Sequence, residues 1–589
     1  MDKKLLRTLL YIALILMIVG GLVANLVQRD FGNVTVRDVR FAAFNGRKYS
    51  ALLYIPKGVT TDHPAPGILA IHGYINSRET EDGFAIEFAR RGYVVLALDQ
   101  SGHGYSDPPA FADGFGGIAG LAYLQTLQIV DQKNICLQGH SMGGWAVVIA
   151  AATFPNAYKC MVLEGSSTGT LGAPAGTATF PKNLMVVEST WDEFASLMWL
   201  TPKATDVGKT DKMKTLFNTT SDVVQGQLYG NLADGTARIL WQPKNTHAED
   251  TISTVAIGYA IDWMQQNLVG GVQIPSSNQI WYWKEIGTLF ALLGFFMFII
   301  ASGGLLLTTP FFSTLVDPLP AAKGLTGWGW WLGAIITAAL GPLTLFTFIT
   351  WEGTLLPSAT WLAPQLITNQ IVFWAVLNGL IALVLFLIWH FLLVKKADRG
   401  TGDEYGLTWG GKLNWPKIGK SFLLAAAVVA LGYATLQLTG YFYTTDYRFW
   451  IFAVKLPDRL QFYIMLRYVI PLFFYFFVAS MILFGQLRKA KFNMWQEMGV
   501  NFGIFFIGYM VFLLAEYIPM WTTGLLLNPD QPLWTIIAYQ FVPVLGFAAF
   551  FSTFFYRKTG RIYTSAFLNA LLWTLVIVAG TATHFAFGG

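Results

Sequence analysis

The chain has 589 residues, too many for a single hydrophobic core, so several domains are expected. Hydrophobic residues make up 54% of the chain and charged residues only 12%, whereas soluble proteins carry roughly 25% charged residues. This skew predicts a membrane protein. The net charge of +5 comes largely from Lys and Arg beside apolar runs, which argues against a nucleic-acid partner.

The first apolar run, Thr8–Val27, follows a basic segment that contains Lys3, Lys4 and Arg7. A run of about 20 uncharged residues is long enough to cross a bilayer. We therefore expect residues 1–30 to form an uncleaved transmembrane anchor. A cleaved signal peptide is the alternative, although its apolar core usually spans only about 7 to 15 residues.

Residues 31–268 show the pattern of alternating strands and helices. The expected strands are Val34–Phe44, Lys48–Ile55, Gly67–Ile71, Tyr93–Leu98, Asn134–Gln138, Lys159–Glu164, Asn183–Glu188 and Ala237–Gln242. The expected helices are Glu79–Arg91, Gly117–Leu127, Met142–Phe154 and Ala248–Leu268. An antiparallel pair followed by strand–helix alternation predicts an α/β domain with a mostly parallel, eight-stranded, doubly wound sheet.

The only two cysteines, Cys136 and Cys160, fall inside two of these expected strands. The sequence therefore argues against a disulfide scaffold or a zinc site, and buried thiols are expected. Pairing across neighbouring strands is the alternative.

A sharp turn is predicted at Gly139-His140-Ser141-Met142-Gly143, which fits the pattern G-x-S-x-G between a strand and a helix. Side chains at positions 139 and 143 would collide with neighbouring backbone. Ser141 is expected in a strained conformation that lifts its hydroxyl above the sheet.

Other polar residues follow the predicted strands. Tyr74 comes after His72-Gly73 at a strand end, so its N–H and that of Met142 are candidate donors of an oxyanion hole. Asp192 follows a later strand and His247 follows the last one. The segment Asp99-Gln-Ser-Gly-His-Gly-Tyr-Ser106 is expected to be a structural turn.

The three candidate residues follow the order Ser141, Asp192, His247 along the chain. With this order, residues 34–268 resemble the α/β-hydrolase superfamily, and in particular its esterase, lipase, dienelactone-hydrolase and serine-peptidase branches. The resemblance implies that Ser141 is the nucleophile, that His247 is the general base and acid, and that Asp192 orients the imidazole. Glu193 and Glu164 are alternatives to Asp192. The sequence contains no metal, phosphate or nucleotide motif, so no cofactor is expected.

The sequence leaves two alternatives for the segment that covers such a site. The segment Gly165–Lys182 is too short for a large helical cap. The insertion Glu193–Thr236 has enough apolar residues for a small cover. In the alternative, the membrane domain itself flanks the mouth of the site.

Residues 269–280 are rich in Gly, Pro and Ser and are expected to form a linker. Residues 281–589 then form a second, all-α transmembrane domain. Eight apolar spans are predicted, at 285–308, 328–350, 369–394, 418–442, 463–486, 499–520, 532–555 and 563–585.

The charges of the connecting loops predict the orientation. Fifteen basic residues lie on the side of the amino terminus: Lys3, Lys4, Arg7, Lys323, Lys395, Lys396, Arg399, Lys412, Lys417, Arg488, Lys489, Lys491, Arg557, Lys558 and Arg561. The opposite short loops contain three, Arg448, Lys455 and Arg459. We therefore expect a multi-pass bacterial cell-membrane protein with a cytoplasmic amino terminus, and with the α/β domain and the carboxyl terminus outside the cytoplasm.

Ionisable residues inside spans are the informative exceptions. Arg467 and Glu516 are expected at the same depth near the outer face. They would form either a structural ion pair or a polar lining near the catalytic mouth. Softer candidates of the same kind are Asn378, Gln437, Gln540 and Asn569.

Together these patterns predict a membrane-embedded serine hydrolase that cleaves an ester or amide of a lipid-like or amphipathic substrate on the extracytoplasmic face. Membrane lipid is the expected partner, because anchoring alone needs only one span. Two alternatives stay open. One is a transporter or assembly protein with a hydrolase-like accessory domain, and the other is an acyltransferase that uses the same triad.

Overall fold

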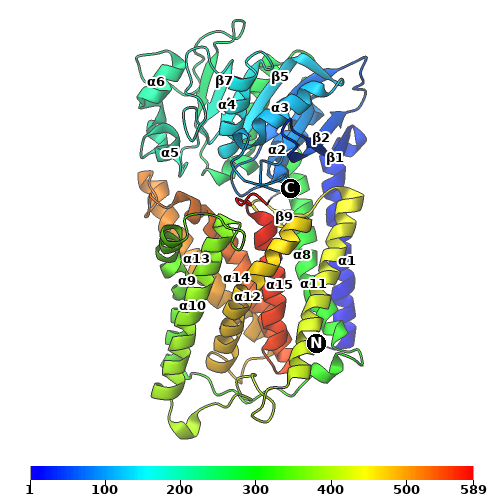
Figure 1. Cartoon of the computed structure of the whole chain (residues 1–589), viewed down its shortest axis with the longest axis vertical. Coiled ribbons are helices and arrows are strands. Elements are labelled where there is room, and N and C mark those ends of the chain that lie inside the picture. The colour runs from blue at the N-terminus through cyan, green and yellow to red at the C-terminus, as the bar shows by residue number, and fades with distance from the viewer. Residues whose placement is uncertain (1, 588–589) are drawn as a thin grey trace.

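The computed structural model describes residues 2–587. A sheet-containing domain lies at one end of an elongated molecule, and a bundle of long helices forms the rest (Figure 1). The first helix, α1, runs from the far end of the bundle towards the sheet domain (Figure 1).

The sheet contains the eight predicted strands, in the spatial order β1-β2-β4-β3-β5-β6-β7-β8. They are β1 (Val34–Ala42), β2 (Lys48–Pro56), β3 (Ala65–Ile71), β4 (Val94–Leu98), β5 (Val130–His140), β6 (Cys160–Glu164), β7 (Leu184–Val187) and β8 (Arg238–Trp241). β2 pairs antiparallel with β1 and β4, and the remaining pairs are parallel. The predicted fold class, a mostly parallel eight-stranded sheet, is confirmed.

Helices cover both faces of this sheet, because its strands are apolar on both sides. One face packs against α2 (Asp82–Arg90) and α7 (Thr254–Asn267), and the other packs against α3 (Gly117–Thr126) and α4 (Met142–Thr153). The insertion before β8 adds the short helices α5 (Ala195–Trp199) and α6 (Asp211–Phe217).

Nine helices between residues 2 and 587 are long and apolar enough to cross a membrane. They are α1 (Lys3–Gln28), α8 (Trp281–Leu306), α9 (Gly327–Leu355), α10 (Leu366–Ile388), α11 (Trp415–Tyr443), α12 (Arg459–Met481), α13 (Met494–Thr523), α14 (Pro532–Thr559) and α15 (Tyr563–Gly580). A two-stranded ribbon, β9 (Tyr447–Phe449) and β10 (Phe452–Val454), joins α11 to α12. Such a set of helices is compatible with a multi-pass membrane protein.

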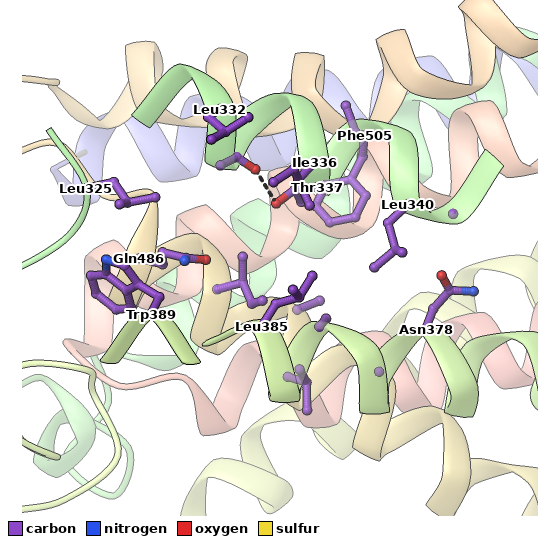
Figure 2. A pocket seen from close by; sticks show the side chains of 18 of the residues that line it. Leu325, Leu332, Ile336, Thr337, Leu340, Asn378, Leu385, Trp389, Gln486 and Phe505 are labelled. Atoms are coloured by element: carbon purple, nitrogen blue, oxygen red, sulfur yellow. Dashed lines mark hydrogen bonds between the residues drawn. The ribbon is translucent and has the colours of Figure 1, made fainter. Parts of the chain in front are cut away.

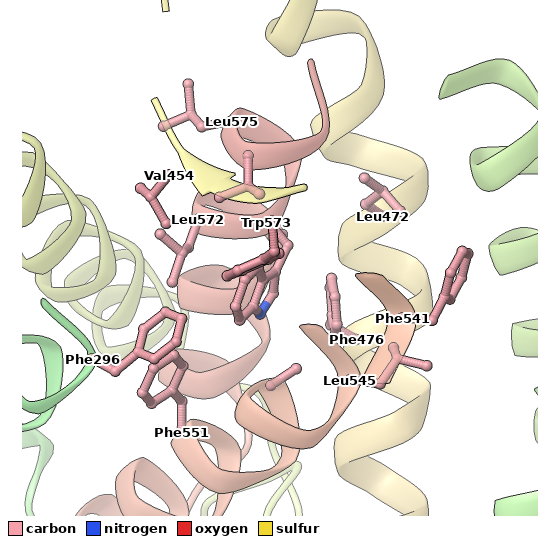
Figure 3. Packing of buried hydrophobic residues seen from close by; sticks show 14 of the residues in the cluster. Phe296, Val454, Leu472, Phe476, Phe541, Leu545, Phe551, Leu572, Trp573 and Leu575 are labelled. Atoms are coloured by element: carbon pink, nitrogen blue, oxygen red, sulfur yellow. The ribbon is translucent and has the colours of Figure 1, made fainter. Parts of the chain in front are cut away.

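The last helix is shorter than predicted, ending at Gly580 instead of residue 585. The chain beyond it turns to the sheet domain, where the Thr583 N–H donates to Gly102 O at 2.8 Å. α15 supplies much of the bundle core, with Trp573 packed against both Phe296 of α8 and Phe551 of α14 (Figure 3).

The two cysteines form a disulfide, so the expectation of buried thiols is wrong. β5 and β6 are parallel neighbours, and their register places Cys136 directly opposite Cys160, with their Cα atoms 4.7 Å apart. The sequence showed two strands but not their register, and register decides whether two cysteines can bond.

Arg467 and Glu516 do not form an ion pair, which is one of the two predicted arrangements. Arg467 lies over the ring of Trp361, with its guanidinium carbon 4.6 Å from the ring centroid. Glu516 accepts from the Asn528 N–H at 3.0 Å. α12 packs mainly on α10 and α15, whereas α13 packs on α9 and α14, so equal depth did not bring the two side chains together.

The sheet domain is bound to the bundle by buried ion pairs. Glu79 contacts Lys455 at 3.2 Å and Arg448 at 3.3 Å, and Asp82 pairs with Lys284 of α8. Burial opposes ionisation of Glu79, but the surrounding cations outweigh it and hold the pKa of this carboxyl well below its usual range. This interface positions the carboxyl ends of the parallel strands against the bundle.

Candidate active site

Ser141 lies between β5 and α4 in the predicted strained conformation, with φ 54° and ψ −122°. A Cβ atom on Gly139 would overlap the Gly143 carbonyl, and one on Gly143 would overlap the Ile71 carbonyl. The expected role of the two glycines is therefore confirmed. The turn can form only with glycine at both positions, and it exposes the Ser141 hydroxyl to a cavity.

The structure brings Asp192 to His247. The Nδ1 atom of His247 lies 2.8 Å from Asp192 Oδ2, and both side chains are buried. Gly165 makes room for the pair, because a Cβ atom there would lie 2.7 Å from His247 Nδ1. This glycine was missed in the sequence, where nothing marks the close approach.

The two alternative acids do not contact the imidazole. Glu193 Oε2 instead accepts the backbone N–H of His247 at 2.8 Å, so it holds the loop and not the ring. The carboxylate of Glu164 is buried at the end of β6 with no hydrogen-bond partner among the described residues. Asp192 is thus the acid that the geometry selects.

Ser141 and His247 line one cavity of about 490 Å³. No hydrogen bond joins the side chains of these two described residues, so their shared cavity, and not a direct contact, is what brings them together.

Two backbone N–H groups next to Ser141 are free to bind an anion. A Cβ atom on Gly73 would lie 3.0 Å from Ser141 Cβ, so the chain at 73–74 passes directly beside the serine. Neither the Tyr74 N–H nor the Met142 N–H donates to any residue between 2 and 587, and both residues line the cavity. This is the arrangement that a tetrahedral oxyanion requires.

The electrostatics of the site suit a base. Burial opposes protonation of His247, but the adjacent Asp192 carboxylate outweighs it and raises the pKa of the imidazole above its ordinary 6.5. Burial, helped by the charge of Asp192, raises the pKa of Glu193 to about 7. Burial lowers the pKa of both His72 and His140 to about 3, so these histidines are neutral.

Helices and loops of the bundle contact the catalytic loops directly. Tyr517 of α13 donates to Glu193 Oε1 at 2.5 Å, and the indole of Trp450, between β9 and β10, donates to Ala248 O at 2.9 Å. Tyr74 Oη lies 2.9 Å from the Nε2 atom of His584. Sequence analysis missed these contacts because aromatic residues at span ends fit an interfacial belt equally well.

The residues that line the cavity show which segments cover the site. The insertion contributes Phe194, Leu197 and Met198, as its apolar residues predicted. The bundle contributes Ile451, Leu533, Ile536 and Gln540. Both alternatives are therefore realised, and the wall is predominantly apolar.

No group of three or more His, Cys, Asp and Glu side chains among residues 2–587 is arranged to hold a metal ion.

Comparison with known proteins agrees with the fold of the sheet domain. The family described as "alpha/beta hydrolase fold" matches residues 66–231, and this domain has that fold, as the resemblance predicted. A monoacylglycerol lipase of Mycolicibacterium smegmatis is 33% identical over 115 residues, covering 18% of this chain and 40% of the relative. An uncharacterized Mycobacterium tuberculosis protein is 31% identical over 105 residues, covering 17% and 28%.

The chain thus aligns with well under half of the length of these curated relatives. Among solved structures, the Pyrococcus furiosus esterase Pf2001 is 15% identical, with a TM-score of 0.29, and the match covers 41% of this chain and 94% of the esterase. The sheet domain therefore has the α/β-hydrolase fold, and the described part of the chain also contains helices that are long and apolar enough to span a membrane.

The raised pKa of His247 predicts the pH dependence of the reaction. Only the neutral imidazole accepts a proton from Ser141, so kcat/KM for a chromogenic ester should fall as the pH drops through a midpoint above 6.5. In Asp192→Asn the rate should fall on the order of 10⁴-fold, and the midpoint should move to lower pH. A wild-type midpoint at or below 6.5 would contradict the assignment.

The contact between Tyr517 and Glu193 predicts that the bundle positions the base. In Tyr517→Phe, loss of this hydrogen bond should reduce kcat/KM about five-fold. Without its donor Glu193 binds a proton more readily, so less negative charge faces His247 and the acid limb of the pH profile should shift to lower pH.

Tyr441→Phe is the matched control, because Tyr441 is 78% exposed at the end of α11. It should leave both the rate and the profile unchanged. A purely structural role for Tyr517 would lower the yield of folded protein without moving the acid limb.

Proposed function

We propose that this chain is a membrane-embedded serine hydrolase that cleaves an ester or amide of a lipid-like acyl substrate. The observation that carries the proposal is the buried His247–Asp192 pair, whose His247 lines the same cavity as Ser141 at the strained turn. The triad as a unit has one common use, the activation of a serine for acyl transfer.

In this mechanism Ser141 Oγ attacks the acyl carbon while its proton passes to Nε2 of His247. The oxyanion accepts from the N–H groups of Tyr74 and Met142. When the tetrahedral intermediate collapses, the bond to the leaving alcohol or amine breaks, and that group takes the proton from His247. Water, activated by the same imidazole, then attacks the acyl-serine and releases the acid and free Ser141.

A lipid-like substrate is supported by the cavity wall. Apolar side chains from the insertion and from α14 surround the serine, so an acyl chain gains free energy by leaving water there. The similarity to a monoacylglycerol lipase agrees with an acyl substrate.

An extracytoplasmic position for the catalytic domain is supported in two ways. The loop charges favour a cytoplasmic amino terminus, fifteen basic residues against three. In addition, Cys136 and Cys160 form a disulfide, a bond that persists in oxidising compartments. On this proposal the protein is a multi-pass bacterial cell-membrane protein, with residues 1–30 as anchor, 269–280 as linker and 281–589 as the transmembrane domain.

The test of the chemistry is active-site labelling in detergent or native membranes. A fluorophosphonate probe should label the wild-type protein and Ser196→Ala, but not Ser141→Ala. Ser196 is an exposed serine near the same cavity, so it controls for the loss of a hydroxyl. Folded wild-type protein that stays unlabelled would refute the hydrolase proposal, and free acid among the products separates hydrolysis from acyl transfer.

The test of the orientation uses single introduced cysteines in intact cells. Lys57→Cys and Lys491→Cys both place a thiol at an exposed position, on the sheet domain and between α12 and α13 respectively. A membrane-impermeant maleimide should label the first variant directly and the second only after the membrane is permeabilised. The native cysteines are disulfide-bonded and do not react. The reverse pattern would invert the proposed topology.

A further inference from the structure

Three cavities lie one after another between the catalytic serine and the bilayer-facing side of the bundle. The first is the catalytic pocket already described. The second, here the bundle cavity, has about 60 Å³ and is lined by α10, α12, α14 and α15. The third, here the membrane groove, has about 290 Å³ and lies between α9 and α10, backed by α12 and α13.

Neighbouring cavities share wall residues. Ile75 and Gln540 line both the catalytic pocket and the bundle cavity. Tyr475 and Leu545 line both the bundle cavity and the membrane groove. Neighbouring cavities are therefore adjacent, and the residues that they share lie at the boundary between them.

The membrane groove is open to the surroundings of the bundle. Leu332 and Ile336 of α9 face Leu385 of α10 across it (Figure 2). These three side chains are 59%, 41% and 38% exposed, on helices that are long and apolar enough to span a membrane. On a membrane-spanning surface, that exposure is exposure to lipid chains.

The polarity along this route changes at one place. The bundle cavity is lined almost entirely by apolar side chains, and its boundary with the catalytic pocket carries the Gln540 amide. The side-chain amide of Gln540 has no hydrogen-bond partner among residues 2–587, although an amide near a bilayer normally has one. A carbonyl or hydroxyl of a substrate held at Ser141 would provide it.

We propose that the three cavities together form the binding site for one long acyl chain of a membrane lipid, with the scissile carbonyl at Ser141. This inference rests on the proposed function and names its substrate class, a long-chain acyl ester that reaches the serine from the bilayer. The chain lies in the bundle cavity, which has the smallest volume of the three, and its end reaches towards the membrane groove. The polar part of the lipid stays beside Gln540 and the oxyanion donors.

The first experiment measures chain-length selectivity in the full-length protein. Ala375 lines the bundle cavity and is 1% exposed, so Ala375→Leu fills this narrow space. The kcat/KM ratio of p-nitrophenyl palmitate to p-nitrophenyl butyrate should fall at least ten-fold, because each buried methylene contributes roughly four-fold to binding. Butyrate cleavage, which needs only the catalytic pocket, should be retained.

Ala430→Leu is the matched control. It makes the same change on α11, at an exposed position outside all three cavities, and should leave the ratio unchanged. An unchanged ratio in Ala375→Leu would overturn the acyl-chain site while leaving the hydrolase proposal intact. Failure of the wild type to cleave either ester would refute the hydrolase proposal itself.

A second measurement needs no variant and is decisive if Ala375→Leu does not fold. A fluorophosphonate with a 16-carbon chain and a terminal diazirine is bound to Ser141 of the wild-type protein and then photolysed. Mass spectrometry should find the cross-link on α10, α12 or α14, at residues such as Ile371, Leu472 or Val544. Cross-links confined to the sheet domain would overturn the inference.

Discussion

The buried ion pairs between the sheet domain and the bundle are the constraint on which the rest of the structure depends. Glu79 with Lys455 and Arg448, and Asp82 with Lys284, are almost entirely removed from water. A buried charge left without its partner is strongly destabilising, so the two domains can dock in only one orientation. In that orientation the carboxyl ends of the parallel strands, where Ser141, Asp192 and His247 lie, face the bundle and not the solvent.

Because the domains dock in this way, residues of both domains form the site. Tyr517 and Trp450 hold the loop of His247 through Glu193 and Ala248, and His584 contacts Tyr74. The bundle also contributes part of the cavity wall around the serine. A bundle of many membrane-capable helices is more than an anchor needs, and on the proposed function its contacts position the base and its apolar side chains receive the substrate.

The loops on the sheet-domain side of the bundle carry few cations. The sequence places only Arg448, Lys455 and Arg459 there, and two of the three pair with Glu79 of the sheet domain. Two of these three cations are therefore neutralised at the interface between the domains. On the proposed topology, the disulfide between β5 and β6 lies on the same side, where an oxidising environment would preserve it.

Local patterns in the sequence determined the strands, the nine apolar helices and the strained turn at Ser141, because alternation, apolar run length and glycine at 139 and 143 act over a few residues. The sequence also placed Asp192 and His247 just after predicted strands. Only the tertiary structure decided that Cys136 faces Cys160, that Arg467 and Glu516 lie apart, and that Gln540 joins the catalytic pocket to the bundle cavity. These depend on strand register and helix neighbours, which are set by packing between residues far apart in the chain and leave no local signal.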